Sequence, residues 1–380
     1  MIRALKFIGI FLAVAAGIYA VAIIPNFSAF KTLFTNTEGM REGSEWIEKT
    51  FSLQGLTEYI GANKERVSVV SYEVNQPDSG IYFQEDVPRA MGTIQNFFLL
   101  AEYERQVEEG IISPGTPVDM EEVNRFGLPQ ISESIHKEAL NALSERTDAA
   151  PTIDELVSVM VQFNDLSISN WLWYTLTPSR IDSLMLNLEL SQTDSLAPFS
   201  GIYLSLRESN EPTRTLQRQL AQRFAEDPGY REQMTNIFKE DRIGFSFTEE
   251  RDALEFFPKT TAAEMARVMA ALWNNALISP AVDERIKQKM GWALGTKTMN
   301  KHFDGYGAMY DNRMGLLGGI DFGVSTYDKK PRVQAIFFDR LPVAFWLHMS
   351  AGHMHEDYQQ RLIWDPALLD ATLTQIANND

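Results

Sequence analysis

The order of strand and helix patterns along the chain restricts its fold more than any other feature. Residues 66–74 and 81–84 are rich in β-branched and aromatic side chains and flank a turn at 75–80, which predicts a hairpin. Strand patterns return only near the other end, at 315–327, 332–339 and 343–350. Between these regions, apolar side chains recur at helical spacing. Strands at both ends with helices between them do not fit a βαβ series.

The simplest packing for this order is an α+β fold with one antiparallel sheet made from both ends of the chain. Terminal helices, the last at about 357–377, would cover the sheet, and an all-α lobe would be inserted between its strands. We expect an α/β lobe at about 46–86 and 306–380 and a helical lobe at about 87–305. The seam between two such lobes is a natural cleft.

Several helix starts are indicated by single residues. Thr152 and Glu155 stand in a capping-box arrangement before an apolar helical face. Pro178 suits a first helical position, and Ser279 followed by Pro280 suits a cap and a first position. We found no internal repeat and no low-complexity tract.

The N-terminal segment predicts export. Residues 7–24 form an apolar run preceded by Arg3 and Lys6, and no further charge occurs before Lys31. A run of this length can span a bilayer as a helix. The preceding positive charges predict that the N-terminus stays inside and that the rest crosses the membrane.

A cleaved signal peptide is the alternative, with small residues at 20–22 as a cleavage site. On either interpretation the folded part is extracytoplasmic, in the periplasm or at the cell surface. Residues 25–45 resemble a linker in composition, and we expect the folded domain at 46–380.

Composition excludes several classes of function. The net charge of −17 opposes binding to phosphate backbones, so we expect no nucleic-acid partner. The absence of cysteine rules out disulfides, thiolate metal sites and a cysteine nucleophile. We expect no cofactor.

Four stretches carry a family resemblance that covers roughly residues 60–375. The hairpin of 66–84 runs into a helix that begins in "AMGTIQNFF" (90–98). The other three are "MVQFNDLSISNWLW" (160–173), "TTAAEMARVMAALWNNALISP" (260–280) and "NRMGLLGGIDFGVSTYDKKPRVQAIFFD" (312–339). Together they resemble the penicillin-recognising serine hydrolases, especially the class A β-lactamases.

The resemblance implies serine acylation as the chemistry of the family. A Ser attacks an amide carbonyl, a Lys three positions later on the same helix face accepts its proton, and backbone amides hold the oxyanion. A Ser-Asp-Asn motif helps to protonate the leaving nitrogen, and the Lys of a Lys-Thr/Ser-Gly strand attracts the substrate carboxylate.

The matching positions in this chain have lost most of these groups. The nucleophile position is Gly92 and the Lys position is Gln95, whose amide is no base near neutral pH. The Ser-Asp-Asn positions are Asn164, Asp165 and Leu166, and the Lys-Thr-Gly positions are Arg313, Met314 and Gly315. No deacylating Glu-x-x-Leu-Asn string occurs at 178–210, although Glu189 lies in that stretch.

Three functional hypotheses follow from these losses. The first is an extracytoplasmic pseudoenzyme that binds cell-wall peptide or an envelope protein through the old cleft. Its low-ranked ligand-binding residues are Arg313, Asp165, Asn164 and Gln95, with no catalytic residue expected. The second is a hydrolase with changed chemistry in the same cleft. The third is an interaction protein that uses another surface, such as the acidic segment 211–256.

Other candidates have simpler interpretations. The Ser-x-x-Lys strings at 28–31 and 134–137 lack the expected surroundings, and we interpret the second, which contains His136, as a solvated helix start. Thr93 adjoins the lost nucleophile but points about 100° away from it on a helix. Weak metal candidates are His348, His353 and His355, which we interpret as the polar start of the last helix, so that no metal is expected.

Overall fold

The computed structural model describes residues 41–377, apart from 42, 48, 50–51, 132, 146–148, 241–246, 291–302, 307–309, 312–318, 328–329 and 352–353. The predicted membrane segment at 7–24 lies outside these residues, as does most of the predicted linker. In the part of the chain that is described, no helix is long and apolar enough to cross a bilayer.

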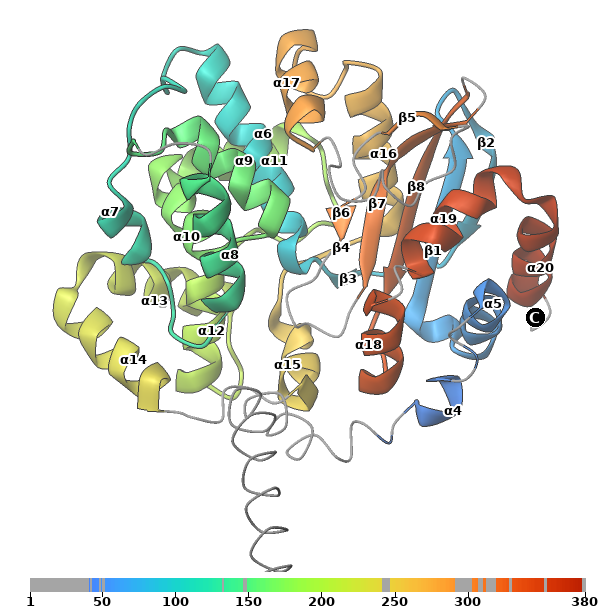
Figure 1. Ribbon diagram of the computed structural model, residues 1–380, viewed down its shortest axis with the longest axis horizontal. Coiled ribbons are helices and arrows are strands. Elements are labelled where there is room, and N and C mark those ends of the chain that lie inside the picture. The colour runs from blue at the N-terminus through green and yellow to red at the C-terminus, as the bar shows by residue number, and fades with distance from the viewer. Residues whose placement is uncertain are drawn as a thin grey trace, which may run out of the picture.

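An antiparallel sheet joins the two ends of the domain (Figure 1). Its strands are β1 (Val67–Glu73), β2 (Gln76–Phe83), β5 (Phe303–Tyr306), β6 (Tyr310–Asp311), β7 (Ile320–Tyr327) and β8 (Lys330–Phe338). The order is β2-β1-β8-β7-β5, with β6 also paired to β7. In the middle of the sheet, Ala335 of β8 pairs with Val70 of β1 on one side and with Phe322 of β7 on the other. The predicted α+β class and its antiparallel sheet are therefore confirmed.

Helices make up most of the remaining chain. The first group is α4 (Ser44–Ile47), α5 (Leu53–Ala62), α6 (Gln95–Glu108), α7 (Met120–Asn124), α8 (Glu133–Ser144), α9 (Ile153–Phe163), α10 (Leu166–Thr175), α11 (Pro178–Asn187) and α12 (Phe199–Glu208). The second group is α13 (Arg214–Glu226), α14 (Pro228–Glu240), α15 (Phe247–Ala253), α16 (Ala262–Trp273), α17 (Pro280–Met290), α18 (Val343–Ala351), α19 (Met354–Trp364) and α20 (Pro366–Ala377). Short 3₁₀ turns are η3 (Lys64–Arg66), η4 (Gly92–Ile94) and η5 (Leu254–Phe256), and a two-strand ribbon is formed by β3 (Arg89–Ala90) and β4 (Lys259–Thr260).

The period-two pattern of the strands separates two hydrophobic cores. Val70 of β1 and Phe337 of β8 belong to the core shared with α6, α9 and α16. Val69 and Ile336, one residue away on the same strands, belong to the core shared with α5 and α18–α20. Alternating side chains point to opposite faces of a sheet, so both faces are covered by helices.

A third core lies in an excursion of the chain between α11 and β4. The helices α12, α13, α14 and α15, named here the α12–α15 bundle, pack around Tyr203, Phe224 and Phe257, among others. Leu128 and Leu166 from outside the bundle join the same cluster. In Figure 1 the bundle lies at the lower side of the helical half of the molecule.

The predicted third C-terminal strand, at 343–350, is wrong. These residues form α18, and Trp346 N–H donates to the Pro342 carbonyl at 2.9 Å. A short apolar run fits a strand or a buried helix equally well from its pattern alone. Packing favours the helix, because Phe345 and Met349, four positions apart and so on one helix face, both lie in the core shared with α5. Phe345 also stacks on Tyr59 of α5, with ring centroids 4.1 Å apart.

Two smaller differences have local causes. The predicted turn at 75–80 is mostly strand, because β2 is an edge strand and tolerates Pro77 and Gly80. The predicted last helix is two helices, α19 and α20, separated at Asp365 before Pro366. The predicted caps hold: Thr152 and Glu155 form both bonds of a capping box, and Pro178 and Pro280 begin α11 and α17.

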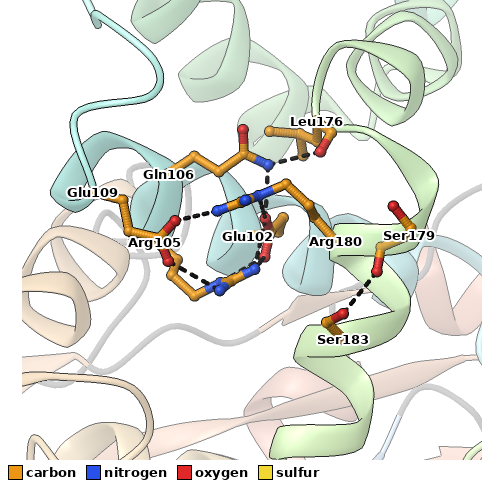
Figure 2. Close-up of polar contacts among 8 residues, drawn as sticks. All are labelled: Glu102, Arg105, Gln106, Glu109, Leu176, Ser179, Arg180 and Ser183. Carbon is orange, nitrogen blue, oxygen red and sulfur yellow. Dashed lines mark hydrogen bonds and ion pairs between the residues drawn. The ribbon is translucent and has the colours of Figure 1, made fainter.

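Helix α6 carries two buried carboxylates. Glu102 is fully buried and accepts two hydrogen bonds from the Arg105 guanidinium, at 2.8 and 2.9 Å, and one from Gln106 at 2.7 Å. Arg180 of α11 approaches it to 3.5 Å and also pairs with Glu109 (Figure 2). Burial raises the pKa of Glu102, and the bonds from Gln106 and Arg105 oppose that rise.

The second carboxylate, Glu104, anchors a different helix. It is 1% exposed and accepts a hydrogen bond from Arg285 of α17 at 2.7 Å, while Lys289 lies 3.7 Å away. A buried charge is costly unless it is paired. The two carboxylates therefore hold α6 between α11 and α17.

We expect Glu102→Ala to lower the free energy of unfolding by about 3 kcal/mol, because it leaves Arg105 and Arg180 without their buried partner. Urea unfolding at neutral pH measures the change. Glu109→Ala is the matched control, since Glu109 contacts the same two arginines but is 37% exposed. Its expected loss is below about 1 kcal/mol. Equal losses of unfolding free energy in the two variants would show that the buried Glu102 contributes no more to stability than the exposed Glu109.

Candidate functional site

The nucleophile position lies in a tight turn between the β3–β4 ribbon and α6. Met91 N–H donates to the Pro258 carbonyl at 2.7 Å, which ties the turn to the ribbon. Gly92 follows with a φ of +50° and is buried. A residue with a side chain pays a steric penalty in this left-handed region, and glycine does not. The turn thus has a backbone conformation that suits glycine rather than serine.

The Lys position is occupied by an amide that is already bonded. Gln95 is 2% exposed, and its Oε1 accepts a hydrogen bond from the Ala197 N–H at 3.2 Å. Its Nε2 lies 3.5 Å from the Gly92 carbonyl oxygen. Gln95 therefore ties the start of α6 to the segment that leads into the α12–α15 bundle.

The Ser-Asp-Asn positions form the junction between α9 and α10. Asn164 ends α9 in a left-handed conformation, and Asp165 caps α10 by accepting the Ile168 N–H at 2.8 Å. Asp165 is fully buried. Leu166 is 4% exposed and packs in the third core, so an apolar contact stands where the family has an amide.

A polar side chain joins this junction to α6. Asn96 Nδ2 donates to Asn164 Oδ1 at 3.4 Å, and Asn96 Oδ1 accepts a bond from Ser169 at 2.7 Å. The Ser169 hydroxyl also lies 2.6 Å from the Asp165 carbonyl oxygen. The structure therefore brings the first two predicted motifs together at the start of α6.

The third predicted motif, Arg313, Met314 and Gly315, lies outside the described residues. The nearest described strand before it, β6, pairs with β7 and lies beside η4. The predicted ligand-binding role of Arg313, Asp165, Asn164 and Gln95 stays a prediction.

His136 contacts this junction, which was not predicted from the sequence. Its Nδ1 lies 2.6 Å from Asp165 Oδ2, and its Nε2 lies 3.0 Å from Asn124 Oδ1. The ring is 17% exposed. His136 does stand near the start of a helix, α8, but it is not simply solvated. Nothing in its local sequence signals the contact, because the partner is 29 positions away.

The other residues of that string do not join the site. Ser134 and Lys137 are exposed, and Lys137 pairs with Glu133 at 2.9 Å. Because both ring nitrogens of His136 already have partners, the imidazole is not placed as a free base. Its evident effect is to hold α8 against Asp165.

Glu189 is exposed and lies in a turn after α11, with a φ of +52°. Its backbone carbonyl accepts a bond from Arg267 at 3.0 Å. Gln95 is contacted instead by Ala197, whose backbone N–H donates to its side chain. This contact to Gln95 is therefore made by a backbone amide and not by the Glu189 carboxylate.

The three histidines near the C-terminus are separated by the fold. His348 lies on α18, His353 falls outside the described residues, and His355 lies on α19. His355 is 2% exposed, and its Nε2 lies 3.1 Å from Asp321 of β7. Within the described ranges, no group of three His, Cys, Asp or Glu side chains has a geometry that could hold a metal ion.

Burial closes the site around the motif positions. Thr93 is fully buried, and Gly92, Gln95, Asp165 and Leu166 are buried as well. The arrangement can support a structural junction between α6, α10 and the α12–α15 bundle, and it holds neither nucleophile nor base at the family positions.

Comparisons with known proteins concern the family and the fold. The family model described as "Beta-lactamase enzyme family" matches residues 53–342, which is more than half of the chain. The fold resembles that of a beta-lactamase from Sphaerobacter thermophilus DSM 20745, with a TM-score of 0.52 and 10% identity over 81% of this chain and 96% of that one.

A structure of PBP-A is also similar, with a TM-score of 0.50 and 12% identity over 82% of this chain and 96% of that one. No curated protein matches the sequence. At these identities the structural likeness shows a shared fold alone. Membership of the family rests on the match of the sequence to the family model. The chain therefore belongs to the beta-lactamase enzyme family of serine hydrolases.

Proposed function

We propose that this protein is a membrane-anchored, extracytoplasmic member of the family that has lost serine acylation and acts by binding. The observation that carries the proposal is Gly92, a buried residue with positive φ at the nucleophile position. Acylation needs a hydroxyl there and a proton acceptor three residues later. Gln95 supplies an amide whose oxygen is already bonded to Ala197.

The proposed partner is cell-wall peptide or an envelope protein. Export is supported by the apolar run at 7–24 and the positive charges before it. A domain outside the cytoplasm meets the wall and its proteins directly. The acidic surface makes a nucleic-acid partner unfavourable.

A hydrolase with changed chemistry is the second candidate, and the contact of His136 with Asp165 favours it. A histidine oriented by a carboxylate is the arrangement that activates a serine. Ser167 lines a cavity of about 400 Å³ together with His136. However, His136 Nε2 is bonded to Asn124, and the described contacts include no hydrogen bond from Ser167 to His136.

We expect no covalent adduct when the protein is incubated with a fluorescent penicillin, denatured and separated by gel electrophoresis. The reason is that the family positions hold no hydroxyl nucleophile. A serine-acylating family member run in parallel must give a labelled band. A labelled band from this protein, located by peptide mass spectrometry at Ser167 or Thr93, would establish the second candidate instead.

Restoring the two motif residues should not restore the reaction. We expect Gly92→Ser with Gln95→Lys to remain unlabelled, because Leu166 fills the site and residue 92 is buried. Gly92→Ser alone should lower the free energy of unfolding by about 2 kcal/mol through backbone strain and burial of a hydroxyl.

Gly110→Ser is the control for backbone strain. Gly110 also has a positive φ, +70°, but an added Cβ would meet nothing within 4 Å. Its expected cost is about 1 kcal/mol, from backbone strain alone. Labelling of the double variant together with unchanged stability would refute the assignment of Gly92 to a closed turn.

The location is tested separately. We expect the full-length protein to sediment with membranes and to be digested by protease added from the extracytoplasmic side. Deletion of residues 2–24 should leave the protein in the cytosolic fraction, protected from the same protease. Release of the full-length protein into the soluble extracytoplasmic fraction would indicate a cleaved signal peptide.

A further inference from the structure

The chain enters and leaves the α12–α15 bundle at one place, named here the neck, where residues 193–194 lie beside residues 259–260. Asp194 N–H donates to the Lys259 carbonyl at 2.8 Å, and Asp194 Oδ2 accepts the Lys259 N–H at 3.0 Å. One residue away on each side, the hydroxyls of Thr193 and Thr260 are 2.7 Å apart. The chain therefore enters and leaves the bundle at the same place, next to the β3–β4 ribbon.

A cavity of about 520 Å³ lies at this neck. Its lining includes Pro88, Asp194, Arg214, Glu255, Phe256 and Lys259. Sites for small molecules usually measure about 300–1,000 Å³, so the volume suits a small ligand. None of these residues belongs to the acylation motifs, and the cavity is thus a different place from the Gly92 turn.

Arg214 is a partly buried cation in this cavity, and its ion pair is long. Its side chain is 22% exposed, its nearest carboxylate oxygen is 3.7 Å away on Asp194, and its Nη1 donates to Gln217 and to the Phe256 carbonyl. Arg218, one turn later on α13, instead forms a bidentate pair with Asp182 at 2.7 and 2.8 Å. Burial lowers the pKa of Arg214 to about 10, with Asp194 opposing.

The other three charged residues at the cavity are also incompletely paired. Among the described residues, neither the Lys259 ammonium nor the Glu255 carboxylate has an ion pair or a side-chain hydrogen bond. Asp194 has one oxygen bonded to a backbone N–H and is half exposed. The cavity thus presents two cations and two carboxylates beside the partly buried ring of Phe256.

We propose that the neck cavity binds a small zwitterion, a free amino acid or short peptide that carries both a carboxylate and an ammonium group. The ligand carboxylate would lie against Arg214 and Lys259, where a guanidinium can donate two parallel bonds. The ligand ammonium would lie against Asp194 and Glu255. Phe256 and Pro88 offer apolar surface to a side chain.

Mixed charge is the reason for preferring a zwitterion to a simple anion. Asp194 and Glu255, which line the same cavity as Arg214 and Lys259, repel a bare phosphate or sulfate. A ligand with both charges satisfies all four groups at once. The site is independent of the acylation positions, so the penicillin test and the following test can fail separately.

The test is calorimetric titration of the full-length protein with the dipeptide alanyl-alanine, its N-acetyl form and its C-terminal amide. We expect saturable binding of the dipeptide with one site per chain. The acetylated form lacks the ammonium and the amide lacks the carboxylate, so we expect the affinity of each to be lower than that of the dipeptide by at least about tenfold. Sulfate should not displace the dipeptide at equal concentration.

Variants locate the binding at the neck. Arg214→Gln should weaken dipeptide binding about tenfold and leave the weaker binding of the amide unchanged, because only the carboxylate contact is lost. Arg214→Lys keeps the charge and should retain part of the affinity. Arg223→Gln on the same helix is the matched control, since Arg223 is 55% exposed and does not line the cavity.

Three results would overturn the proposal. They are no saturable binding of the dipeptide, equal affinity of the wild-type protein and a folded Arg214→Gln variant, and displacement of the dipeptide by an equal concentration of sulfate. Circular dichroism of each variant shows whether it is folded. If Arg214→Gln does not fold, Arg214→Lys and Lys259→Gln are compared with the wild-type protein. Unchanged dipeptide affinity in both variants would also overturn the proposal.

Discussion

The burial of α6 is the constraint on which the rest of the structure depends. Nearly every residue from Gln95 to Tyr103 is enclosed, so the polar groups of this helix need partners inside the protein. Glu102 binds Arg105 and faces Arg180 of α11, whereas Glu104 binds Arg285 of α17. Since an unpaired carboxylate at either position would be costly, the neighbouring helices are held in place around α6.

The burial of α6 also determines the surroundings of the positions that match the family's catalytic motifs. At its start α6 meets the β3–β4 ribbon, the α9–α10 junction and the segment leading to the α12–α15 bundle. In a serine hydrolase such a place holds reactive groups facing a substrate. Here Gln95 and Asn96 use their amides to join these elements, and Asp165 binds Ile168 and His136. The described residues at the positions that resemble the family's motifs thus take part in the packing of α6, α10 and the α12–α15 bundle.

Parts of the fold with strong local patterns could be predicted from the sequence. Alternating β-branched residues predicted β1, and cap residues predicted the starts of α9, α11 and α17. Residues 343–350 were assigned to the wrong class because an apolar run of that length has no distinguishing period. Their helical form places Phe345 and Met349, four positions apart, in one core with α5, and that packing depends on residues distant in the chain.

By itself, the sequence determined the α+β class and the sheet made from both chain ends, because the order of strand and helix patterns follows from periodicity and residue type. The assignment of residues to the catalytic motif positions is what the family resemblance implies. Only the tertiary structure decided that Gly92 has a positive φ in a closed turn, that His136 reaches Asp165, and that Arg214 and Lys259 share a cavity. Such contacts join residues distant in the chain, and no local spacing encodes them, because they depend on how complete helices and strands pack.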